Sequence, residues 1–365
     1  MFGIQNRHIA RNMLVSMLLA LGILTFVMLS GQLFKVLDFL SRGVSPVLFG
    51  KYILYMLPDL LRFTLPLSML VAVVLVFSRM SADNEIVAMK TSGISLWQIV
   101  TPGIVLSFCL CVICAWLSLF VSPLFRYRAE QLRWEGLESY VAMLEPGRFV
   151  SIPPNFKVRI GERQGDQLRD VHVYMLDNKG NEVKDITAAV GYVRIQGEEQ
   201  QLSLNLRDVT VSELTMNDGR TETRHWHLGQ LELELGIGGN QKRSATARKV
   251  KYMDLRLLCA QILLEQEEGR DTAAFLLELH RRLSMAMSPF SFLLLGLPFG
   301  IRSRRSEKSV GLLICVLLAL GFYAFLQAAD MLKRHAGLHP EYIIWLPNAL
   351  YQSVGLWIMH RIGKH

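Results

Sequence analysis

The sequence predicts an α-helical membrane protein with six transmembrane helices, three before and three after an inserted all-β, jelly-roll-like domain. The composition supports the membrane class, since 51% of the residues are hydrophobic and only 19% are charged. Long runs without charges lie toward both ends of the chain. The residues between them are more polar, and hydrophobic and hydrophilic side chains alternate there with the period of half-buried β-strands.

Six hydrophobic runs are each long enough, or nearly so, to cross a hydrocarbon core of ~30 Å once as a helix. They are Met13–Phe34, Tyr52–Ser78, Thr91–Phe125, Leu283–Ile301, Ser309–Ala329 and Tyr342–Met359. The first run is longer than the core of a signal peptide, so we expect it to be retained as a span. Within the second run, Asp59 and Arg62 share one helix face, and we expect them to pair near its outer boundary.

Lysine and arginine in the short loops predict the orientation, because these residues accumulate on the cytoplasmic side of a membrane protein. With the N-terminus inside, the cytoplasmic side holds ten of them: Arg7, Arg11, Arg79, Lys90, Arg302, Arg304, Arg305, Lys308, Arg361 and Lys364. The outer short loops hold four: Arg42, Lys51, Lys333 and Arg334. Both termini are therefore expected in the cytoplasm. Anionic headgroups suffice to explain the net charge of +8, so we expect no nucleic-acid partner.

The middle of the chain predicts a β domain outside the membrane. Short segments alternate hydrophobic and polar residues, for example Phe156–Ile160, Leu202–Leu206 and Leu231–Leu235. Turn signals separate them, which favours an antiparallel sandwich, jelly roll or open barrel. We therefore expect three regions: 1–125 with spans one to three, 126–282 with the external β domain and flanking helices, and 283–365 with spans four to six.

A short polar stretch, Ser81–Ser95, separates the second and third runs and has the signals of a helix at about 81–93. Ser81 or Asp83 is expected to cap its N-terminus, and Gly93 is expected to end it in a left-handed conformation. A short helix tethered to a span at each end can carry force from a soluble partner into the bilayer. The alternative interpretation is a capped interfacial turn without a partner.

The chain contains no motif for nucleotide hydrolysis, for zinc hydrolysis or for a nucleophilic serine, so we expect neither an enzyme nor a bound cofactor. Four of the five cysteines lie in predicted spans, and no disulfide framework is expected. Cys109-x-Cys111-x-x-Cys114 and His225-x-His227 have spacings that a metal site can use. Packing in a span and decoration of a strand surface explain these two patterns more simply.

Three ionisable residues, Lys35, Asp38 and Arg42, follow the first run at intervals of about one helical turn. Two interpretations of them stay open. In one, Lys35 only extends its ammonium group to the membrane interface, as long side chains commonly do. In the other, the cations Lys35, Arg42 and Arg62 surround a phosphorylated lipid headgroup and bind it through charge-assisted contacts.

Several segments together resemble one family, the lipopolysaccharide-export permeases of the LptF/LptG type. One segment resembles the coupling helix of that family, at Glu85-x-x-Ala88 with Gly93-Ile94-Ser95. The others resemble the outer end of its first span and its fourth span, at Phe34–Asp38, Glu278–Arg282, Pro289 and Leu297–Gly300. The three-plus-three arrangement around a β domain extends the resemblance to the whole chain.

The resemblance implies one half of a heterodimeric transporter in the bacterial inner membrane, paired with a paralogous permease. Two copies of a cytoplasmic ABC ATPase would dock on the coupling helices, here at Asp83, Glu85, Ala88, Met89, Gly93 and Ile94. Lipopolysaccharide would enter sideways from the outer leaflet, where Lys35 takes the place of a cation of the lipid cavity. The periplasmic jelly roll would receive the acyl chains and pass the lipid to periplasmic bridge proteins.

Two other classes of function are weighed against this one. A secondary transporter of small solutes would need broken helices and polar residues in mid-membrane, and the predicted spans contain few such residues. A membrane-anchored assembly or sensor protein would use its β domain only to bind partners. Whether lipid transport depends on an ATPase separates these alternatives from the first.

Overall fold

The computed structural model contains two compact units, and each is described by itself. One unit comprises Met1–Asp38, Phe49–Ala129 and Ala247–His365, and the other comprises Phe39–Leu48 and Glu130–Thr246. The described residues are 3–40, 46–142, 147, 149–152, 156–164, 167–176, 182–196, 201–217, 220–234, 250–302, 308–331 and 340–363. Side chains at 33–40 and 133–142 are among those that lie outside this description.

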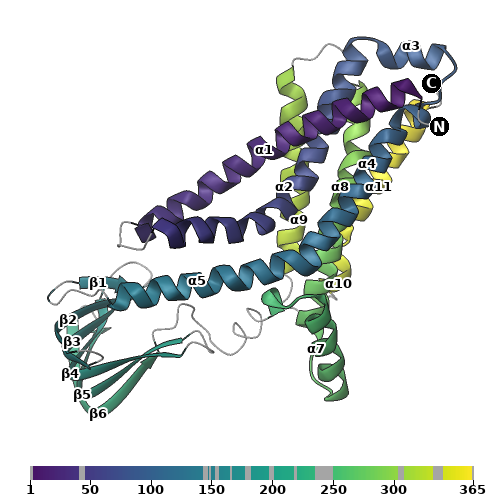
Figure 1. The fold of residues 1–365 in the computed structure, drawn as a ribbon. Coiled ribbons are helices and arrows are strands. Elements are labelled where there is room, and N and C mark those ends of the chain that lie inside the picture. The colour runs from purple at the N-terminus through teal and green to yellow at the C-terminus, as the bar shows by residue number, and fades with distance from the viewer. Residues whose placement is uncertain are drawn as a thin grey trace. The chain divides into compact units, whose positions relative to one another are not determined.

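Helices form at all six hydrophobic runs (Figure 1). They are α1 (Ile4–Leu40), α2 (Pro46–Ala82), α4 (Leu96–Trp116), α8 (Ala273–Arg302), α9 (Lys308–Met331) and α11 (Leu346–Gly363). The third run continues through a π-helical turn, η1 (Leu117–Val121), into α5 (Ser122–Ala142). The shorter helices are α3 (Glu85–Thr91), α7 (Leu255–Glu267) and α10 (Pro340–Ile343).

Four of the helices in the described part of the chain are long and apolar enough to cross a membrane. They are α1, α2, α4 with its continuation, and α8. The apolar part of α9, Leu313–Ala328, is shorter, and α11 has 18 residues. Together with the β-sheet described below, these helices confirm the predicted fold class of membrane helices with an inserted β domain.

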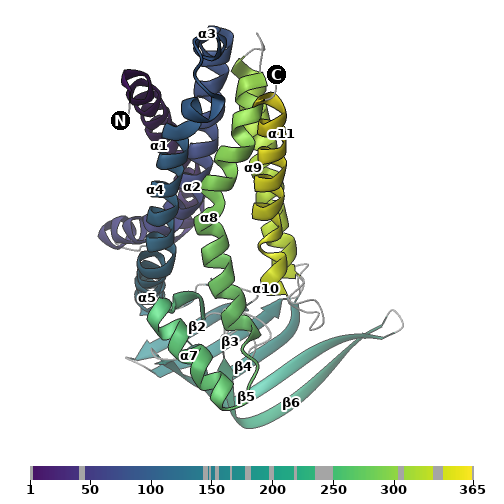
Figure 2. The same ribbon diagram turned by 90° about the vertical axis from the view of Figure 1, so that its right-hand side faces the viewer.

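The two ends of the helical unit carry different elements. The short helix α3 lies at the same end as the start of α1 and the end of α11, whereas α7 and α10 lie at the opposite end (Figures 1 and 2). The length of α2 between these two ends is close to that of a membrane span. Asp59 and Ala82 are 23 residues apart on this helix. At ~1.5 Å per residue this is about 35 Å of helix, roughly the thickness of a hydrocarbon core.

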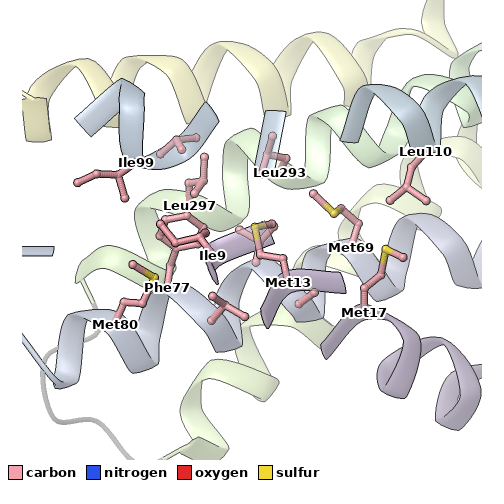
Figure 3. Close-up of a cluster of buried hydrophobic side chains, with 14 of the residues drawn as sticks. Ile9, Met13, Met17, Met69, Phe77, Met80, Ile99, Leu110, Leu293 and Leu297 are labelled. Carbon is pink, nitrogen blue, oxygen red and sulfur yellow. The ribbon is translucent and has the colours of Figure 1, made fainter. Parts of the chain in front are cut away.

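A continuous apolar core joins α1, α2, α4 and α8. Figure 3 shows its centre, where the methionines Met13, Met17 and Met69 lie among branched side chains such as Leu293 and Leu297. All five side chains are buried, and Met13 and Met69 have no exposed surface. Unbranched thioether side chains fill irregular gaps, so this core suits helices that cross at several different angles.

The packing of α11 on α8 uses polar groups and a glycine. Asn348 Nδ2 donates to the Ser284 carbonyl oxygen at 2.8 Å, and Ser291 Oγ donates to Asn348 Oδ1 at 2.6 Å. A Cβ at Gly355 would lie 2.5 Å from the Leu294 carbonyl oxygen, so the two backbones approach closely there. Buried polar groups are costly unless paired, and pairing these groups with one another fixes the register of the two helices.

The second unit contains six antiparallel strands that are neighbours in chain order. They are β1 (Phe149–Ile152), β2 (Phe156–Gln164), β3 (Gln167–Leu176), β4 (Glu182–Gln196), β5 (Gln201–Asn217) and β6 (Arg220–Glu234). The predicted antiparallel β domain is therefore confirmed. Its consecutive order is that of a meander, and among the described strands there is no crossover of the kind a strict jelly roll has. Alternation in a sequence identifies the two faces of a strand but carries no information on strand order.

One face of the sheet is buried and apolar. Its residues are Val158, Ile160, Leu168, Val171, Val173, Ile186, Ala188, Leu204, Leu206, Val209 and Val211. The buried positions change from even to odd numbers within β5, between Leu206 and Val209. In β3 the same change falls between Leu168 and Val171. Each of these strands thus contains one residue more than strict alternation requires.

The extra residues form a straight row across the sheet, which we call the crease: Gly161, Asp170, Ala189, Asp208 and Gly229. Pairs on either side of the row keep one register, since Arg169 and Val171 of β3 pair with Val190 and Ala188 of β4. The two aspartates are left-handed, with φ of 51° and 53°. Asparagine and aspartate tolerate this conformation better than other residues that have a side chain.

Candidate functional sites

The first candidate site is α3, which begins directly after a residue in the left-handed conformation. Asn84 is its N-cap with φ 58°, and its side chain makes no capping hydrogen bond. Ser81 Oγ instead donates to the Ile301 carbonyl oxygen at 2.6 Å, and the Asp83 carboxylate lies 3.7 Å from Arg79 Nε. The prediction that Ser81 or Asp83 caps the helix is therefore wrong, because the left-handed turn at Asn84 separates both residues from the first turn of α3.

The other end of α3 is closed as predicted. Gly93 has φ 86°, and its N–H donates to the Lys90 carbonyl oxygen at 3.0 Å. The Ile94 N–H donates to the Met89 carbonyl oxygen, also at 3.0 Å. This pair of bonds is a Schellman motif, which depends on the left-handed glycine and satisfies carbonyl groups at the helix end. Ser95 then caps α4 by accepting from the Gln98 N–H.

The two faces of α3 differ sharply in exposure. Ile86 is 4% exposed and belongs to the apolar core, and Met89 and Ile94 are half-buried against that core. Asp83, Glu85, Ala88 and Gly93 are exposed, as is Val87. The predicted coupling residues therefore form one short, anchored element, which presents a carboxylate and small apolar groups to the outside and inserts a large side chain into the core.

The second candidate site is a group of charges near the other end of α2. Asp59 Oδ1 lies 3.0 Å from Arg62 Nε, so the pair expected from their spacing is confirmed. The same carboxylate also binds α5, since Arg126 Nη2 donates to Asp59 Oδ2 at 2.8 Å and Ser122 Oγ donates to Asp59 Oδ1 at 2.9 Å. One carboxylate thus holds two guanidinium groups and joins α2 to α5.

Arg126 was missed as a partner of Asp59 by reasoning from sequence. The two residues are far apart in the chain, and no local rule relates them. The π-helical turn η1 directly precedes Ser122, and Ser122 and Arg126 are four residues apart on one face of α5. The sequence did contain one signal for this contact. Arg126 follows Ser122 by four positions at the end of an apolar run, so both side chains can reach the same partner.

A third cluster of charges lies at the start of α8. Arg282 is 1% exposed, and its Nε donates to Glu278 Oε1 at 3.0 Å. Its Nη1 donates to the Met253 carbonyl oxygen at 2.6 Å, and its Nη2 donates to the Val250 carbonyl oxygen at 3.2 Å. Arg282 therefore fastens the chain segment that precedes α7 to the side of α8.

The predicted lipid-binding residues have different outcomes. The backbone of Lys35 and Asp38 belongs to α1, but their side chains lie outside the described residues, as does all of Arg42. Arg62 is described and is enclosed within the chain, with 4% exposure and its guanidinium group 4.7 Å from the centre of the Phe63 ring. The structure thus brings Arg62 together with Asp59 and Arg126.

The two weak metal patterns have ordinary surroundings. Cys111 and Cys114 are buried in α4, whereas Cys109 is exposed. His225 and His227 each share a hydrogen bond with a hydroxyl group of the neighbouring strand. Among the residues that the structure describes, no group of three or more potential metal ligands comes together.

Comparison with known proteins adds to this geometry. The sequence model of one family, described as lipopolysaccharide export system permease LptF/LptG, matches residues 7–361. The chain belongs to the LptF/LptG family. It is similar to the lipopolysaccharide export system permease protein LptF of Escherichia coli (strain K12), with 23% identity over 353 residues, which cover 96% of this chain and 93% of that protein.

Two further relatives match the chain to the same or to a smaller extent. The LptF protein of Shigella flexneri matches with the same identity of 23% and the same coverage of 96% and 93%. An uncharacterised protein of Rickettsia prowazekii (strain Madrid E) is 20% identical over 201 residues, covering 54% of this chain and 56% of that protein. As an LptF/LptG protein with several apolar helices, this chain is a multi-pass inner-membrane component of lipopolysaccharide export.

Proposed function

We propose that this chain is one permease half of an ATP-driven ABC transporter that extracts lipopolysaccharide from the outer leaflet of the inner membrane. Its partner half is a paralogous permease, and a dimer of a cytoplasmic ABC ATPase drives the pair. The lipid is passed on to periplasmic bridge proteins. Both termini and α3 lie on the cytoplasmic side, and the central region, 126–282, lies in the periplasm between the span regions 1–125 and 283–365.

The observation that carries this proposal is the construction of α3. Glu85 is exposed, whereas Ile86 of the same helix is embedded in the transmembrane core. A soluble protein that binds the exposed face of α3 can therefore displace Ile86 within that core. A solvated interfacial turn needs neither the embedded isoleucine nor the Schellman closure at Gly93. Asp83, Ala88, Met89, Gly93 and Ile94 complete the element on which the ATPase docks.

Affinity purification of the tagged chain from membranes tests the docking. Glu85→Arg is expected to reduce the amount of co-purified ATPase about ten-fold, the effect of losing roughly 1.4 kcal/mol of binding free energy. The matched control is Glu267→Arg, the same change at an exposed glutamate of α7 near the other end of the unit. Wild-type amounts of ATPase with Glu85→Arg would contradict the proposal, and so would export that needs no ATPase.

The lipid path is proposed to start at the outer end of the spans. There Lys35 and Arg42 bind the phosphorylated headgroup, with Asp38 placed between them in the sequence. Arg62 supports this region indirectly, because its enclosed guanidinium group holds Asp59 and Asp59 holds Arg126. The continuous apolar face of the β-sheet is proposed to shelter the acyl chains, since each exposed methylene group costs about 0.8 kcal/mol in water.

Photocrosslinking tests the shelter for acyl chains. A photoreactive side chain in place of Leu204, which is on the buried face of β5, is expected to label lipopolysaccharide when ATP is supplied. The matched control is the neighbouring position Asn205, which points to the other face. Equal labelling at both positions would show that the apolar face does not take up the lipid.

A further inference from the structure

The ends of α2 and α8 are tied together directly beside α3. Ser81 lies in the last turn of α2, three residues before the N-cap of α3, and its hydroxyl group donates to the Ile301 carbonyl oxygen at 2.6 Å. The Ile301 carbonyl lies in the last turn of α8, where the helix leaves some carbonyl groups without a partner of its own. The bond joins two helices through residues that are 220 positions apart in the chain.

A close backbone contact reinforces this bond one turn away. A Cβ at Gly300 would lie 2.8 Å from the Phe77 Cβ and 3.3 Å from the Val74 carbonyl oxygen. A Cβ at Gly296, one turn earlier in α8, would lie 3.1 Å from Leu70 Cδ1. The last turn of α8 therefore approaches the backbone of α2 closely at Gly300, and the turn before it rests on α2 side chains at Gly296. Because both glycines leave no room for a side chain of their own, the two helices are packed tightly together along these two turns.

The embedded side of α3 belongs to the same core. One apolar cluster contains buried side chains from all three helices: Ile86 of α3, Phe77 and Met80 of α2, and Leu297 of α8. Figure 3 labels Phe77, Met80 and Leu297. Ile301 packs against this cluster. A displacement of α3 is therefore resisted by the ends of α2 and α8 together.

The other end of α8 is fastened as well. Arg282 holds the carbonyl oxygens of Val250 and Met253, which belong to the segment leading back from the β-sheet. From Arg282 to Ile301 α8 is a continuous helix of about 28 Å at ~1.5 Å per residue. One helix thus links the surroundings of α3 with the segment that follows the β-sheet.

We propose that Ser81 and Gly300 are positioning residues that make α8 the element by which movement of α3 reaches the outer side. This inference rests on the proposed function. The two spans that flank α3 in the sequence are α2 and α4. The inference adds α8, the fourth span of the chain, which is not connected to α3 in the sequence. In this mechanism α2 and α8 move as a pair, and Arg282 passes the movement to the segment Val250–Met253.

The test uses the complete transporter in proteoliposomes, with lipopolysaccharide released and ATP hydrolysed measured in the same sample. Ser81→Ala and Gly300→Ala are expected to retain the ATPase and its hydrolysis. The lipid released per ATP is expected to fall about five-fold, the factor that the loss of one typical hydrogen bond corresponds to. Ser81→Thr keeps the hydroxyl group and is expected to restore the ratio.

Matched controls are available in the chain. Gly22→Ala adds the same methyl group at a position where no described atom lies within 4 Å. Ser353→Ala removes a hydroxyl group that donates to carbonyl oxygens of its own helix. If the wild-type transporter releases no lipid with ATP, the proposed function fails. If the wild-type transporter releases lipid and Ser81→Ala has the same ratio of lipid to ATP, the proposed role of the contact between α2 and α8 is contradicted. This conclusion does not depend on whether Gly300→Ala folds.

Discussion

At the scale of single residues, the chain concentrates its structural charges where spans end. Asp59 holds Arg62 and Arg126 with one carboxylate, and Glu278 holds Arg282 in the same way. Arginine suits such places because its planar guanidinium group offers five donors in a fixed geometry. Each arrangement ties together segments that are distant in the sequence, so these charges join helices in addition to marking a boundary.

Removing the Asp59 carboxylate is expected to be costly. Asp59→Ala should lower the free energy of unfolding by about 3–5 kcal/mol, because it leaves the enclosed Arg62 without its counter-charge. Thermal unfolding in detergent measures the effect. The matched variant Arg126→Gln keeps the Asp59–Arg62 pair and should cost clearly less, since Arg126 is 23% exposed. A loss from Arg126→Gln as large as that from Asp59→Ala would contradict this account.

Local rules predicted the local part of the candidate sites. The spacing of Asp59 and Arg62 predicted their pair, and Gly93 predicted the left-handed end of α3. The rules failed where the partner is distant, as for Arg126, or where an unusual backbone conformation precedes a helix, as at Asn84. Capping preferences describe side chains next to a helix in extended conformation, and Asn84 does not have that conformation.

At the scale of elements, the crease decides which side chains each strand buries. In β5, Asp208 has a left-handed conformation, and the buried side chains are at even positions before it and at odd positions after it. The pairing of β5 with β4 continues in the same register on both sides of Asp208. The sequence contains this signal, because Leu204 and Leu206 precede Asp208 at even positions and Val209 and Val211 follow it at odd ones. A rule of strict alternation ends a strand at every change of phase, so the predicted segment Leu202–Leu206 is only the first part of β5.

The conformation of the crease makes a prediction for Asp208. Asp208→Gly should preserve or raise the stability of the sheet, because glycine reaches a φ of 53° without strain. Asp208→Val should lower the free energy of unfolding by about 1–2 kcal/mol, because valine bears the full cost of a left-handed conformation, whereas the short polar side chain of aspartate tolerates it. Hydrogen exchange of the β5 amides measures both changes. Equal protection in the two variants would show that the left-handed conformation is not needed there.

At the scale of the whole molecule, the functional argument depends on sidedness. The helical unit places α3 at one end and α7 at the other. Both carry features that a chemical probe can reach, since Asn84 is exposed beside α3 and the thiol of Cys259 is exposed on α7. The positive charges of the short loops predict which end is cytoplasmic, whereas the helices alone do not.

Thiol labelling with a maleimide that cannot cross the inner membrane tests this sidedness. In spheroplasts, Cys259 of the wild-type chain is expected to be labelled from outside. In the Cys259→Ser background, Asn84→Cys is expected to be labelled only after the membrane is permeabilised. The Cys259→Ser chain without the second change reports any labelling of Cys109. Labelling of Asn84→Cys in intact spheroplasts would place α3 on the periplasmic side and remove the basis for an ATPase there.

The row Gly161, Asp170, Ala189, Asp208 and Gly229 has one more consequence. Every strand from β2 to β6 contributes a single residue to it, and the pairing on either side keeps one register. Deleting the whole row at once would therefore leave strictly alternating strands with the same inward side chains. Deleting one member alone would instead shift the register of its strand against every strand that it pairs with.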